Sequence, residues 1–501
     1  MKIFSAAQVR AWDAFTIENE PITSTELMNR AARIFTEWFV GLYQDVSRPV
    51  VVFAGTGNNG GDGLAIARYL HQLFYEAKVL VCAFDDKRSA DFEAQIEQLP
   101  AHDGVSVQWL SDPDQLPEIP PRAIVIDGLF GSGLNRPLSG KWAALVNYIN
   151  GLPNEVVAVD IPSGMFSDQS SAAYPVVEAE RTFSFEAPKR AFFYPENAHR
   201  VREWAYGSIG LHPEFEVLEN TDYQYVTLQV VKKLWKPRKK FGHKGTYGHA
   251  LLITGSFGKM GAAVLAAKAC LRSGTGLLTV LIPGCGYEIM QISVPEAMVQ
   301  CDPDTKMWSQ VPDIQPYKTV GVGPGLGTAP ETAAALKQLI ETASAPLVLD
   351  ADALNLLAQH PEWWLAIPPG SILTPHPGEF ERLFVPDAND FDRTKKQMEY
   401  AQRHQVLIVL KGAHTAIATP DGQCWFNSTG NPGMATGGSG DVLTGILTGL
   451  LAQGYSSQDA CLLGVYLHGL AGDMAAAKLG QEALIASDLI EHLPEAWRRL
   501  Q

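Results

Sequence analysis

The 501-residue sequence predicts two α/β domains, each built around a mainly parallel sheet. Short runs of apolar, β-branched residues alternate with helical segments along most of the chain, which is typical of parallel βαβ units. Glycine-rich loops follow several of these runs, as in Rossmann-like units where a strand leads through a loop into a helix. The length also exceeds that of one typical domain. We therefore expect an N-terminal Rossmann-like three-layer sandwich followed by a second α/β domain.

The composition is that of a soluble globular protein, with 46% hydrophobic and 19% charged residues. A net charge of −15 argues against a nucleic-acid partner. The basic run at 232–244 is better interpreted as a solvated linker than as a nucleic-acid patch. The six cysteines are scattered without a C-x-x-C pair, which indicates neither a zinc site nor a disulfide framework. We expect a cytoplasmic protein, with no signal-peptide core and no apolar run long enough to span a bilayer.

The N-terminal half begins with two expected helices, Ser5–Glu18 and Thr23–Val40, each with a hydroxyl side chain as a possible N-cap. A β-branched run at Pro49–Ala54 then leads through the glycine-rich loop Gly55–Gly63 into a helix from Leu64. This order of strand, loop and helix opens a Rossmann-like unit. The loop also carries oxygen-bearing side chains among its glycines. They suit a cation or a ligand hydroxyl, although they could simply form Asx turns.

Two further strands of this half end in a carboxylate, Ala123–Asp127 and Glu155–Asp160. In a parallel sheet the carboxyl ends of the strands open onto one edge, where ligands bind. Asp127, Asp160 and the loop at Asn58–Asp62 are therefore expected to share one crevice. The last strand is expected around Val201–Leu211.

The motifs of this half resemble those of the NAD(P)H-hydrate epimerase family, also called the YjeF N-terminal family. The matching segments are Asn58–Leu64, Asp127–Leu134, Asp160–Gly164 and Ala187–Lys189. The resemblance implies that Asp160 is the catalytic carboxylate and that three residues bind potassium: Asn59, Asp127 and Ser163. It implies substrate binding by Asn58, Asn59, Gly60, Gly61, Asp62, Gly131, Ser132, Gly133, Leu134, Asn135, Arg136, Pro137 and Asp160. The family also contains non-catalytic interaction modules, which leaves a binding role open.

The pattern breaks after residue 212, and we expect domains at 1–215 and 229–501 joined by a linker at 216–228. Strands are expected at His249–Thr254 and Gly276–Ile282. Further βα units follow at residues 319–327, 346–355, 372–379 and 406–415. This alternation predicts a mainly parallel, doubly wound α/β domain.

The glycine-rich stretch Asn431–Asp441 runs directly into an apolar helix. Free N–H groups and the partial positive charge at a helix N-terminus favour anions, above all phosphate. Asp441 would lie in the first turn and could take a proton from a hydroxyl, although it could also be an ordinary N-cap. Gly445 and Gly449 lie four residues apart on one face, where another backbone could approach closely.

Polar residues also follow several expected strands of this half. Lys411, which follows five apolar residues, could reach a nucleotide phosphate or simply extend into solvent. His376 lies between two prolines and could contact substrate or cap a turn. Asp350 and Asp352 could help to bind a metal–nucleotide complex.

The second half resembles the ribokinase-like superfamily, and within it the ADP/ATP-dependent NAD(P)H-hydrate dehydratases. The segments that carry the resemblance are His243–Gly245, Gly255–Ser256, Met260–Ala263, Gly323–Gly327, Asp350–Asn355, Thr374–Glu379, Lys411–Thr415, Asn431–Gly433 and Gly438–Asp441. The resemblance implies that ADP or ATP binds together with Mg2+. It implies adenine-nucleotide contacts at Lys411, Gly412, Ala413, His414, Thr415 and Gly440. It implies hydrate contacts at Ala262, Gly325, His376 and Asp441, with Asp441 as the proton acceptor.

Taken together, the two resemblances imply a bifunctional repair enzyme for hydrated NADH and NADPH. The first half would interconvert the R and S hydrates, and the second would dehydrate the S form at the expense of ADP or ATP. A homo-oligomer is expected from the resemblance. The alternative is a ribokinase-like kinase of a small vitamin-precursor alcohol, joined to a non-catalytic binding module.

Overall fold

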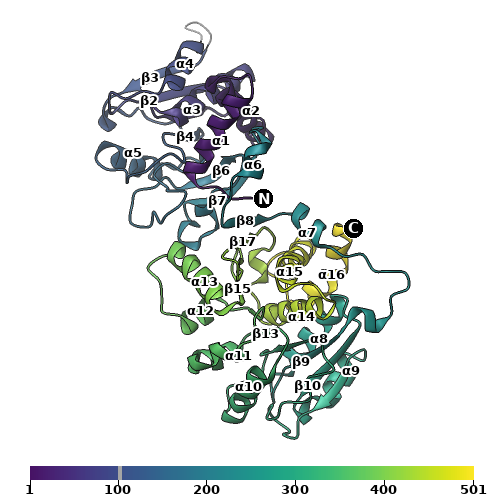
Figure 1. Cartoon of the computed structure of the whole chain (residues 1–501). Coiled ribbons are helices and arrows are strands. Elements are labelled where there is room, and N and C mark those ends of the chain that lie inside the picture. The colour runs from purple at the N-terminus through teal and green to yellow at the C-terminus, as the bar shows by residue number, and fades with distance from the viewer. Residues whose placement is uncertain (100–103) are drawn as a thin grey trace. The chain divides into compact units, whose positions relative to one another are not determined.

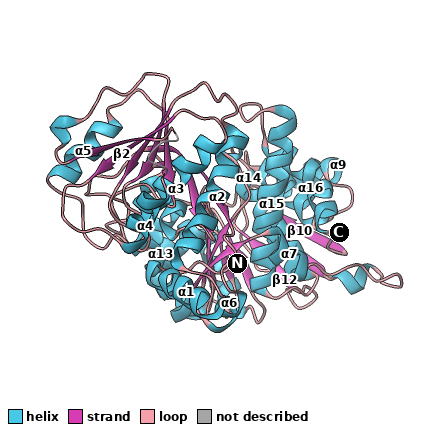
Figure 2. Cartoon of the chain, turned by 90° about the horizontal axis from the view of Figure 1, so that it is seen from above, coloured by secondary structure: helices cyan, strands magenta, loops and turns pink. Residues whose placement is uncertain are grey.

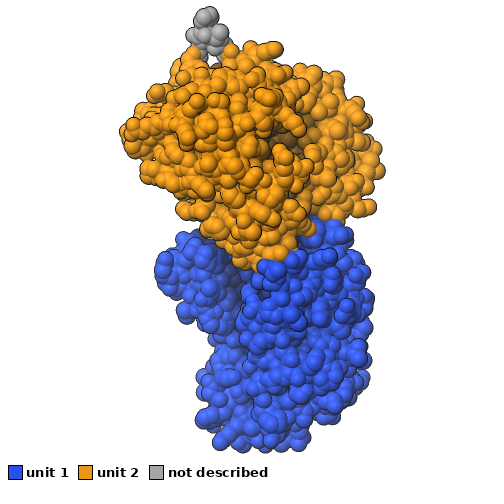
Figure 3. All heavy atoms as spheres, turned by 90° about the vertical axis from the view of Figure 1, so that its left-hand side faces the viewer, with its two compact units in different colours: residues 1, 222–388, 392–501 blue, residues 2–221, 389–391 orange. Residues whose placement is uncertain are grey.

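The computed structural model describes residues 1–99 and 104–501, which form two compact units (Figures 1 and 3). The N-terminal unit contains residues 2–221 and 389–391, and the C-terminal unit contains residue 1 with 222–388 and 392–501. In each unit a sheet lies between layers of helices (Figure 2), which confirms the predicted α/β class.

The N-terminal unit has a seven-stranded sheet in the order β3-β2-β1-β4-β5-β6-β7, and all of its pairs are parallel. Its strands are β1 Val50–Ala54, β2 Ala77–Cys82, β3 Ser106–Leu110, β4 Ile124–Gly128, β5 Val156–Val159, β6 Ala179–Phe185 and β7 Val201–Gly207. Its helices are α1 Ala6–Asn19, α2 Ser24–Leu42, α3 Asn58–Gln72, α4 Ala90–Gln98, α5 Lys141–Asn150 and α6 Pro213–Leu218.

Local sequence signals set the first two helices as predicted. Ser5 and Thr23 each accept a hydrogen bond from the backbone three residues ahead, and the side chains of Gln8 and Glu26 bond back to the caps. These capping boxes satisfy donors at the helix starts that would otherwise lack partners.

The apolar strand β1 is buried on both faces of the sheet. Val50 and Val52 pack into one hydrophobic layer, with side chains from α2 and α3, and Val51 and Phe53 pack into the opposite layer, with side chains from α5. Burial on both sides explains why the strand is continuously apolar instead of alternating. The strand order reverses at β1, so the topological switch point lies between β1 and β4.

The C-terminal unit has a ten-stranded sheet in the order β11-β10-β9-β12-β13-β14-β15-β16-β17-β8. Its strands are β8 Tyr223–Val226, β9 His249–Ile253, β10 Leu277–Ile282, β11 Met298–Cys301, β12 Thr319–Val322, β13 Leu347–Leu349, β14 Ile372–Leu373, β15 Leu407–Leu410, β16 Ala416–Ala418 and β17 Cys424–Asn427. Its helices are α7 Leu228–Leu234, α8 Met260–Arg272, α9 Tyr287–Ser293, α10 Pro330–Thr342, α11 Asp352–Gln359, α12 Pro377–Leu383, α13 Asp390–His404, α14 Ser439–Ala452, α15 Ser457–Leu479 and α16 Ala486–Leu500.

Pairing in this sheet is parallel except on the two sides of β16. The range 216–228, which the sequence analysis treats as a linker, contains the end of α6 and the strand β8. β8 pairs with β17, from Tyr223 opposite Cys424 to Val226 opposite Asn427, and it forms one edge of the sheet. The sequence around residues 223–226 could not predict this strand, because its pairing partner β17 lies about 200 residues further along the chain.

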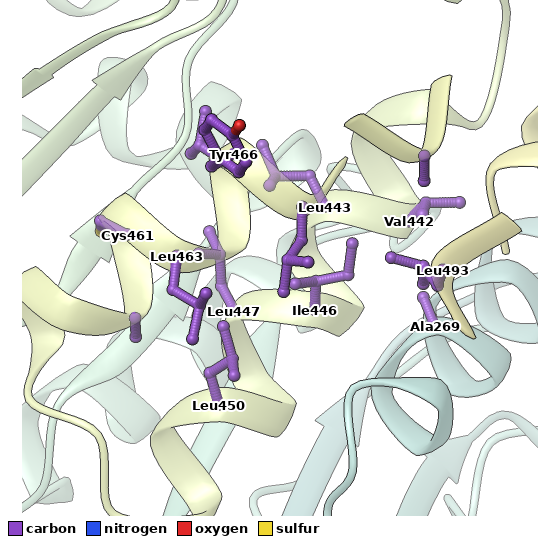
Figure 4. Close-up of a cluster of buried hydrophobic side chains, with 14 of the residues drawn as sticks. Ala269, Val442, Leu443, Ile446, Leu447, Leu450, Cys461, Leu463, Tyr466 and Leu493 are labelled. Carbon is purple, nitrogen blue, oxygen red and sulfur yellow. The ribbon is translucent and has the colours of Figure 1, made fainter. Parts of the chain in front are cut away.

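The expectation that no apolar run could span a bilayer is wrong for α15, which is long and apolar enough by length and composition. Most of this stretch is buried inside the C-terminal unit. Figure 4 shows Cys461, Leu463 and Tyr466 of α15 packed beside α14 side chains such as Leu447 and Leu450. A central helix of a large core is apolar on all sides for the same reason as a membrane helix.

The predicted close approach at Gly445 and Gly449 is confirmed. A Cβ atom on Gly445 would lie 2.1 Å from the carbonyl oxygen of Ala266 in α8, and one on Gly449 would lie 2.7 Å from that of Cys270. Gly438, just before α14, lies against Leu265. Contacts advance along both helices together, so α8 and α14 run in the same direction and their N-termini lie at the same end.

We predict that Gly445→Ala destabilises the protein by about 1–3 kcal/mol or more, because the new methyl group meets a backbone oxygen that cannot move aside. The measurement is the midpoint of urea unfolding. The matched control is Gly261→Ala in α8, where a Cβ meets nothing within 4 Å. That change should leave stability equal or about 0.5–1 kcal/mol higher. Equal midpoints for the two variants would contradict the packing described here.

Candidate active sites

A cavity of about 780 Å³ opens in the N-terminal unit, lined mainly by α1, α2, α3 and the loops after β4, β5 and β6. Of the residues predicted to bind substrate, those that line it are Asn58, Asn59, Asp62, Gly131, Ser132, Gly133, Leu134, Asn135, Arg136 and Asp160. Gly60, Gly61 and Pro137 are not among its lining residues. Gly60 instead allows the chain to close on itself, since a Cβ there would lie 1.8 Å from the oxygen of Gly55.

Asp160 lies on the cavity wall in a buried ion pair. Its Oδ1 is 2.8 Å from Nζ of Lys189, and both residues are less than a tenth exposed. The backbone N–H groups of Phe185 and Ser132 also donate to its carboxylate, over 3.2 and 3.4 Å. Its backbone has a φ of 66°, a left-handed conformation that is unfavourable for a residue other than glycine. Such strain persists where the surroundings impose it, and it is common at active sites.

The three predicted potassium ligands lie beside one another at the switch point. Oδ2 and Oδ1 of the fully buried Asp127 accept hydrogen bonds from the backbone N–H and the Oγ of Ser163, over 2.8 and 2.6 Å. Ser163 Oγ in turn accepts from the backbone of Phe130, next to Gly131, whose Cβ position lies 3.1 Å from Asn59 Oδ1. Burial raises the pKa of Asp127 to about 6, although the hydrogen bonds from Ser163 oppose the rise.

Five further charged residues line the cavity and were not predicted as site residues: Arg10, Asp13, Asp91, Glu186 and Lys189. Burial, together with Asp160 and Glu186, raises the pKa of Asp13 to about 7, against the opposite effect of Lys189. Burial and the neighbouring carboxylates Asp160 and Asp13 also raise the pKa of Asp62. Asp13 lies on α1, where the sequence shows only an amphipathic pattern, so no local signal marks it.

In the C-terminal unit five adjacent parallel strands, β9, β12, β13, β14 and β15, end at one edge of the sheet. The buried Asp350 lies at the centre of this edge, where its oxygens accept from Oγ1 of Thr374 over 2.8 Å and Oγ1 of Thr444 over 2.7 Å. Nζ of Lys411 lies 3.0 Å from Asp350 and 3.8 Å from Glu379. The lysine is therefore turned into the site and does not extend into solvent.

The pKa of Lys411 reflects its carboxylate neighbours. Burial alone would lower this pKa, but Asp350, Glu379 and Asp441 together raise it above its ordinary value. The ammonium group therefore stays charged, and it lies beside the start of α14, 3.3 Å from the Cβ position of Gly440.

Asp441 lies in the first turn of α14, where Gly438, with a φ of 92°, is the N-cap. The interpretation of Asp441 as a simple N-cap is therefore wrong. Burial and the nearby Asp350 raise its pKa to about 7, while Lys411 opposes the rise. Behind the helix start, Nε2 of His468 lies 2.9 Å from the carbonyl oxygen of Ser439, and burial lowers the pKa of this imidazole to about 4. A neutral His468 thus donates to the helix backbone.

Two of the predicted hydrate contacts lie next to each other. Gly325, with a φ of 67°, has a Cβ position 3.2 Å from the side chain of Ala262, in the first turn of α8. Ser256 Oγ donates to the Gly325 carbonyl over 2.7 Å, which joins the loops after β9 and β12. Since α8 and α14 begin at the same end, this pair lies at the same end of the sheet as Asp441.

His376 caps a helix, which is one of its two predicted roles. Its Nδ1 accepts from the backbone of Gly378 over 3.1 Å and of Glu379 over 3.3 Å at the start of α12, and its side chain is exposed. The predicted nucleotide contacts at residues 412–415 form a tight turn after β15. There, Thr415 Oγ1 accepts from the Gly412 N–H over 3.3 Å.

Comparisons with known proteins match both units. Residues 24–191 match the family described as "YjeF-related protein N-terminus", and residues 250–495 match the one described as "NAD(P)H-hydrate dehydratase". The "Bifunctional NAD(P)H-hydrate repair enzyme Nnr" of Moorella thermoacetica is 35% identical over 100% of this chain and 97% of that protein. The protein of the same name from Escherichia coli is 32% identical over 94% of this chain and 89% of that protein.

A solved structure matches the C-terminal unit. It is that of the ADP/ATP-dependent NAD(P)H-hydrate dehydratase from Bacillus subtilis co-crystallized with ATP/Mg2+. The match has a TM-score of 0.50 and 36% identity, and covers 56% of this chain and 99% of that chain. The two-domain architecture and the full-length similarity define a class of fused α/β enzymes. This chain belongs to the family of bifunctional NAD(P)H-hydrate repair enzymes.

We predict that Asp441→Asn stabilises the C-terminal unit by about 1–4 kcal/mol above pH 7, and progressively less as the pH falls from 7 toward 4. The folded-state pKa of Asp441, about 7, lies above its ordinary value of 3.8, so ionisation of this group opposes folding across that interval. The measurement is the free energy of unfolding between pH 4 and 8.

The matched control is Glu491→Gln, at an exposed position of α16, which should change stability by less than about 0.5 kcal/mol at each pH. A stabilisation by Asp441→Asn that did not vary with pH would contradict the raised pKa.

Proposed function

We propose that this chain has both activities of a bifunctional NAD(P)H-hydrate repair enzyme and that each unit performs one of them. The N-terminal unit interconverts the R and S hydrates of NADH and NADPH. The C-terminal unit dehydrates the S form with ADP or ATP. The observation that carries the proposal is the placement of Asp441, with a pKa near 7, at the N-terminus of α14 beside Lys411.

In the C-terminal unit the poor leaving group is the hydroxyl on a ring carbon bonded to nitrogen. Asp441 accepts the hydroxyl proton as that oxygen attacks the terminal phosphoryl group of the nucleotide, whose bond to the leaving phosphate breaks. The lone pair of the ring nitrogen then expels phosphate as the C–O bond of the new ester breaks, and loss of a proton from the neighbouring carbon restores the dihydronicotinamide. Lys411 and the free N–H groups at the start of α14 stabilise the negative charge on the phosphates.

Magnesium is proposed to enter with the nucleotide. Phosphate oxygens are ordinary magnesium ligands, and the B. subtilis relative was co-crystallized with ATP/Mg2+. The oxygens of Asp350 are already engaged by Thr374, Thr444 and Lys411, which does not fit a role as the main metal ligand. Asp352 accepts from the backbone of Gly327 over 2.7 Å. These two carboxylates therefore shape the site around the metal–nucleotide complex.

In the N-terminal unit Asp160 is proposed to move protons at the substrate. Lys189 and the N–H groups of Phe185 and Ser132 hold its carboxylate in place on the cavity wall. The loop at residues 131–136, which lines the same cavity, is positioned to bind the hydrated dinucleotide.

Potassium is proposed to bind beside Asn59, Asp127 and Ser163. A carboxylate, a hydroxyl and an amide offer the hard oxygen donors that such a cation takes. The single buried charge of Asp127 would balance a monovalent ion. Nδ2 of Asn59 is buried and has no hydrogen-bond partner among the described residues, and turning the amide over would present its oxygen there without a change of shape. When bound, the ion supplies positive charge beneath the substrate loop.

The cytoplasm is the proposed compartment; its reducing conditions fit a chain whose six cysteines are free. A homo-oligomer remains our expectation from the family.

The proposal predicts complete recovery of NADH, measured by its absorbance, from a mixture of R and S hydrates with ATP, magnesium and potassium. Asp160→Asn should stop recovery at the fraction present as the S form, because the R form no longer converts. Asp441→Asn should slow recovery by about 10²-fold or more. Consumption of nucleotide on other alcohols without NADH recovery would instead support a kinase.

The potassium proposal predicts that the unfolding temperature of the N-terminal unit rises with potassium concentration at constant ionic strength, since a bound ion stabilises the folded state. Asn59→Ala should abolish this dependence while the Asp127–Ser163 hydrogen bonds remain. The comparison salt is tetramethylammonium, which is too large for a buried site. Equal unfolding temperatures in the two salts would contradict a potassium site.

A further inference from the structure

Asp13 lines the N-terminal cavity, and its carboxyl group differs from that of Asp160 in its hydrogen bonds and ion pairs. Among the described residues it forms no hydrogen bond and no ion pair, although it is largely shielded from water. Asp160, on the same cavity, is held by Lys189 and by two backbone N–H groups. The carboxylate of Asp160 is therefore held in position by its partners, whereas the carboxyl group of Asp13 has none to compete with a bound substrate.

The charges around Asp13 favour a proton on it near neutral pH. The groups that face it are Asp62 from α3, Asp160 after β5, Glu186 and Lys189 after β6, and Arg10 on its own helix. Burial disfavours the ionised form of Asp13, and the carboxylates of Asp160 and Glu186 add to this effect while Lys189 opposes it, so the pKa of Asp13 rises to about 7. In many enzymes the acid and the base are two titratable groups in one site whose surroundings differ enough to suit them to opposite roles.

Epimerisation at the hydroxyl-bearing carbon needs such a pair. If the hydroxyl leaves as water and water returns on the opposite face of the ring, an acid must act on one face and a base on the other. A single carboxyl group fixed to one wall cannot serve both faces. Asp160 is fixed to the wall formed by the loops after β5 and β6, whereas α1 brings Asp13 in from a different element.

We propose that Asp13 is the second proton-transfer residue of the epimerase, acting opposite Asp160. Asp13 gives its proton to the hydroxyl as the C–O bond breaks, the bonding electrons leave with the oxygen, and water departs. The ring nitrogen's lone pair stabilises the carbon cation. Water then adds to the opposite face, a new C–O bond forms, and its proton passes to Asp160. In the reverse direction the two residues exchange roles, so no other reactant is needed.

Asp62 is the nearest competitor for this role, since it lines the same cavity. It lies in the first turns of α3, close to Asp160, Asp13 and Asp91, all of which disfavour its ionised form. Burial and three neighbouring carboxyl groups favour the neutral form of Asp62, which suits it to donate hydrogen bonds to substrate more than to accept a proton. Asp62 is therefore expected to orient the hydrate.

The inference rests on the proposed epimerase activity and is tested in the full-length chain with the pure R hydrate. Asp13→Asn should lower kcat for R-to-S exchange by about 10²–10⁴-fold, with KM changed by less than about threefold. The unfolding temperature of the N-terminal unit reports on its folding and should stay close to that of the wild type, and the rate of NADH formation from the S hydrate, which reports on the C-terminal unit, should be unchanged. Asp13→Glu should restore part of the exchange.

The matched control is Glu18→Gln, which removes one negative charge from an exposed position on the same helix and should leave exchange unchanged. The pH profile of kcat gives a second readout, because the limb near pH 7 in the wild type should disappear from the residual activity of Asp13→Asn. Exchange within threefold of wild type, or a raised KM with kcat unchanged, would overturn the role of Asp13. A wild-type protein with no exchange above the uncatalysed rate would overturn the epimerase function itself.

Discussion

Parallel pairing of the central strands is the constraint on which both sites depend. In a parallel sheet every strand ends at the same edge, so the chain places a loop at that edge after each strand. In the N-terminal unit this brings Asn59, Asp127 and Asp160 together, although about a hundred residues separate the first from the last. In the C-terminal unit it does the same for Asp350 and Lys411.

The two sites share an electrostatic design on different scaffolds. Each contains a lysine–aspartate pair with a buried aspartate, Lys189–Asp160 in one and Lys411–Asp350 in the other. Each also contains a carboxyl group with a pKa near 7, Asp13 in the first and Asp441 in the second. Desolvating these charges opposes folding, and proteins retain such groups mainly where function needs them. The surrounding apolar core supplies the stability that the sites lack.

The chemistry of the hydrate explains why one chain carries two activities. A chiral site that activates the hydroxyl of one epimer leaves the other unrepaired, because the reacting oxygen then lies on the wrong face of the ring. An epimerase removes this limit without any need for the sites to communicate. The membership of the chain in a family of bifunctional enzymes fits this division of labour.

The sequence by itself determined the α/β class, the capping boxes at Ser5 and Thr23 and the close helix packing at Gly445, because each depends on neighbouring residues or on a short periodic pattern. The strand-end residues of both sites were also predictable, since parallel pairing fixes their edge. Only the tertiary structure decided that β8 completes the second sheet, that α15 is a core helix, and that Asp13 joins the first cavity. These features depend on contacts between segments that are distant in the sequence, and a local sequence pattern does not specify which distant segment it will contact.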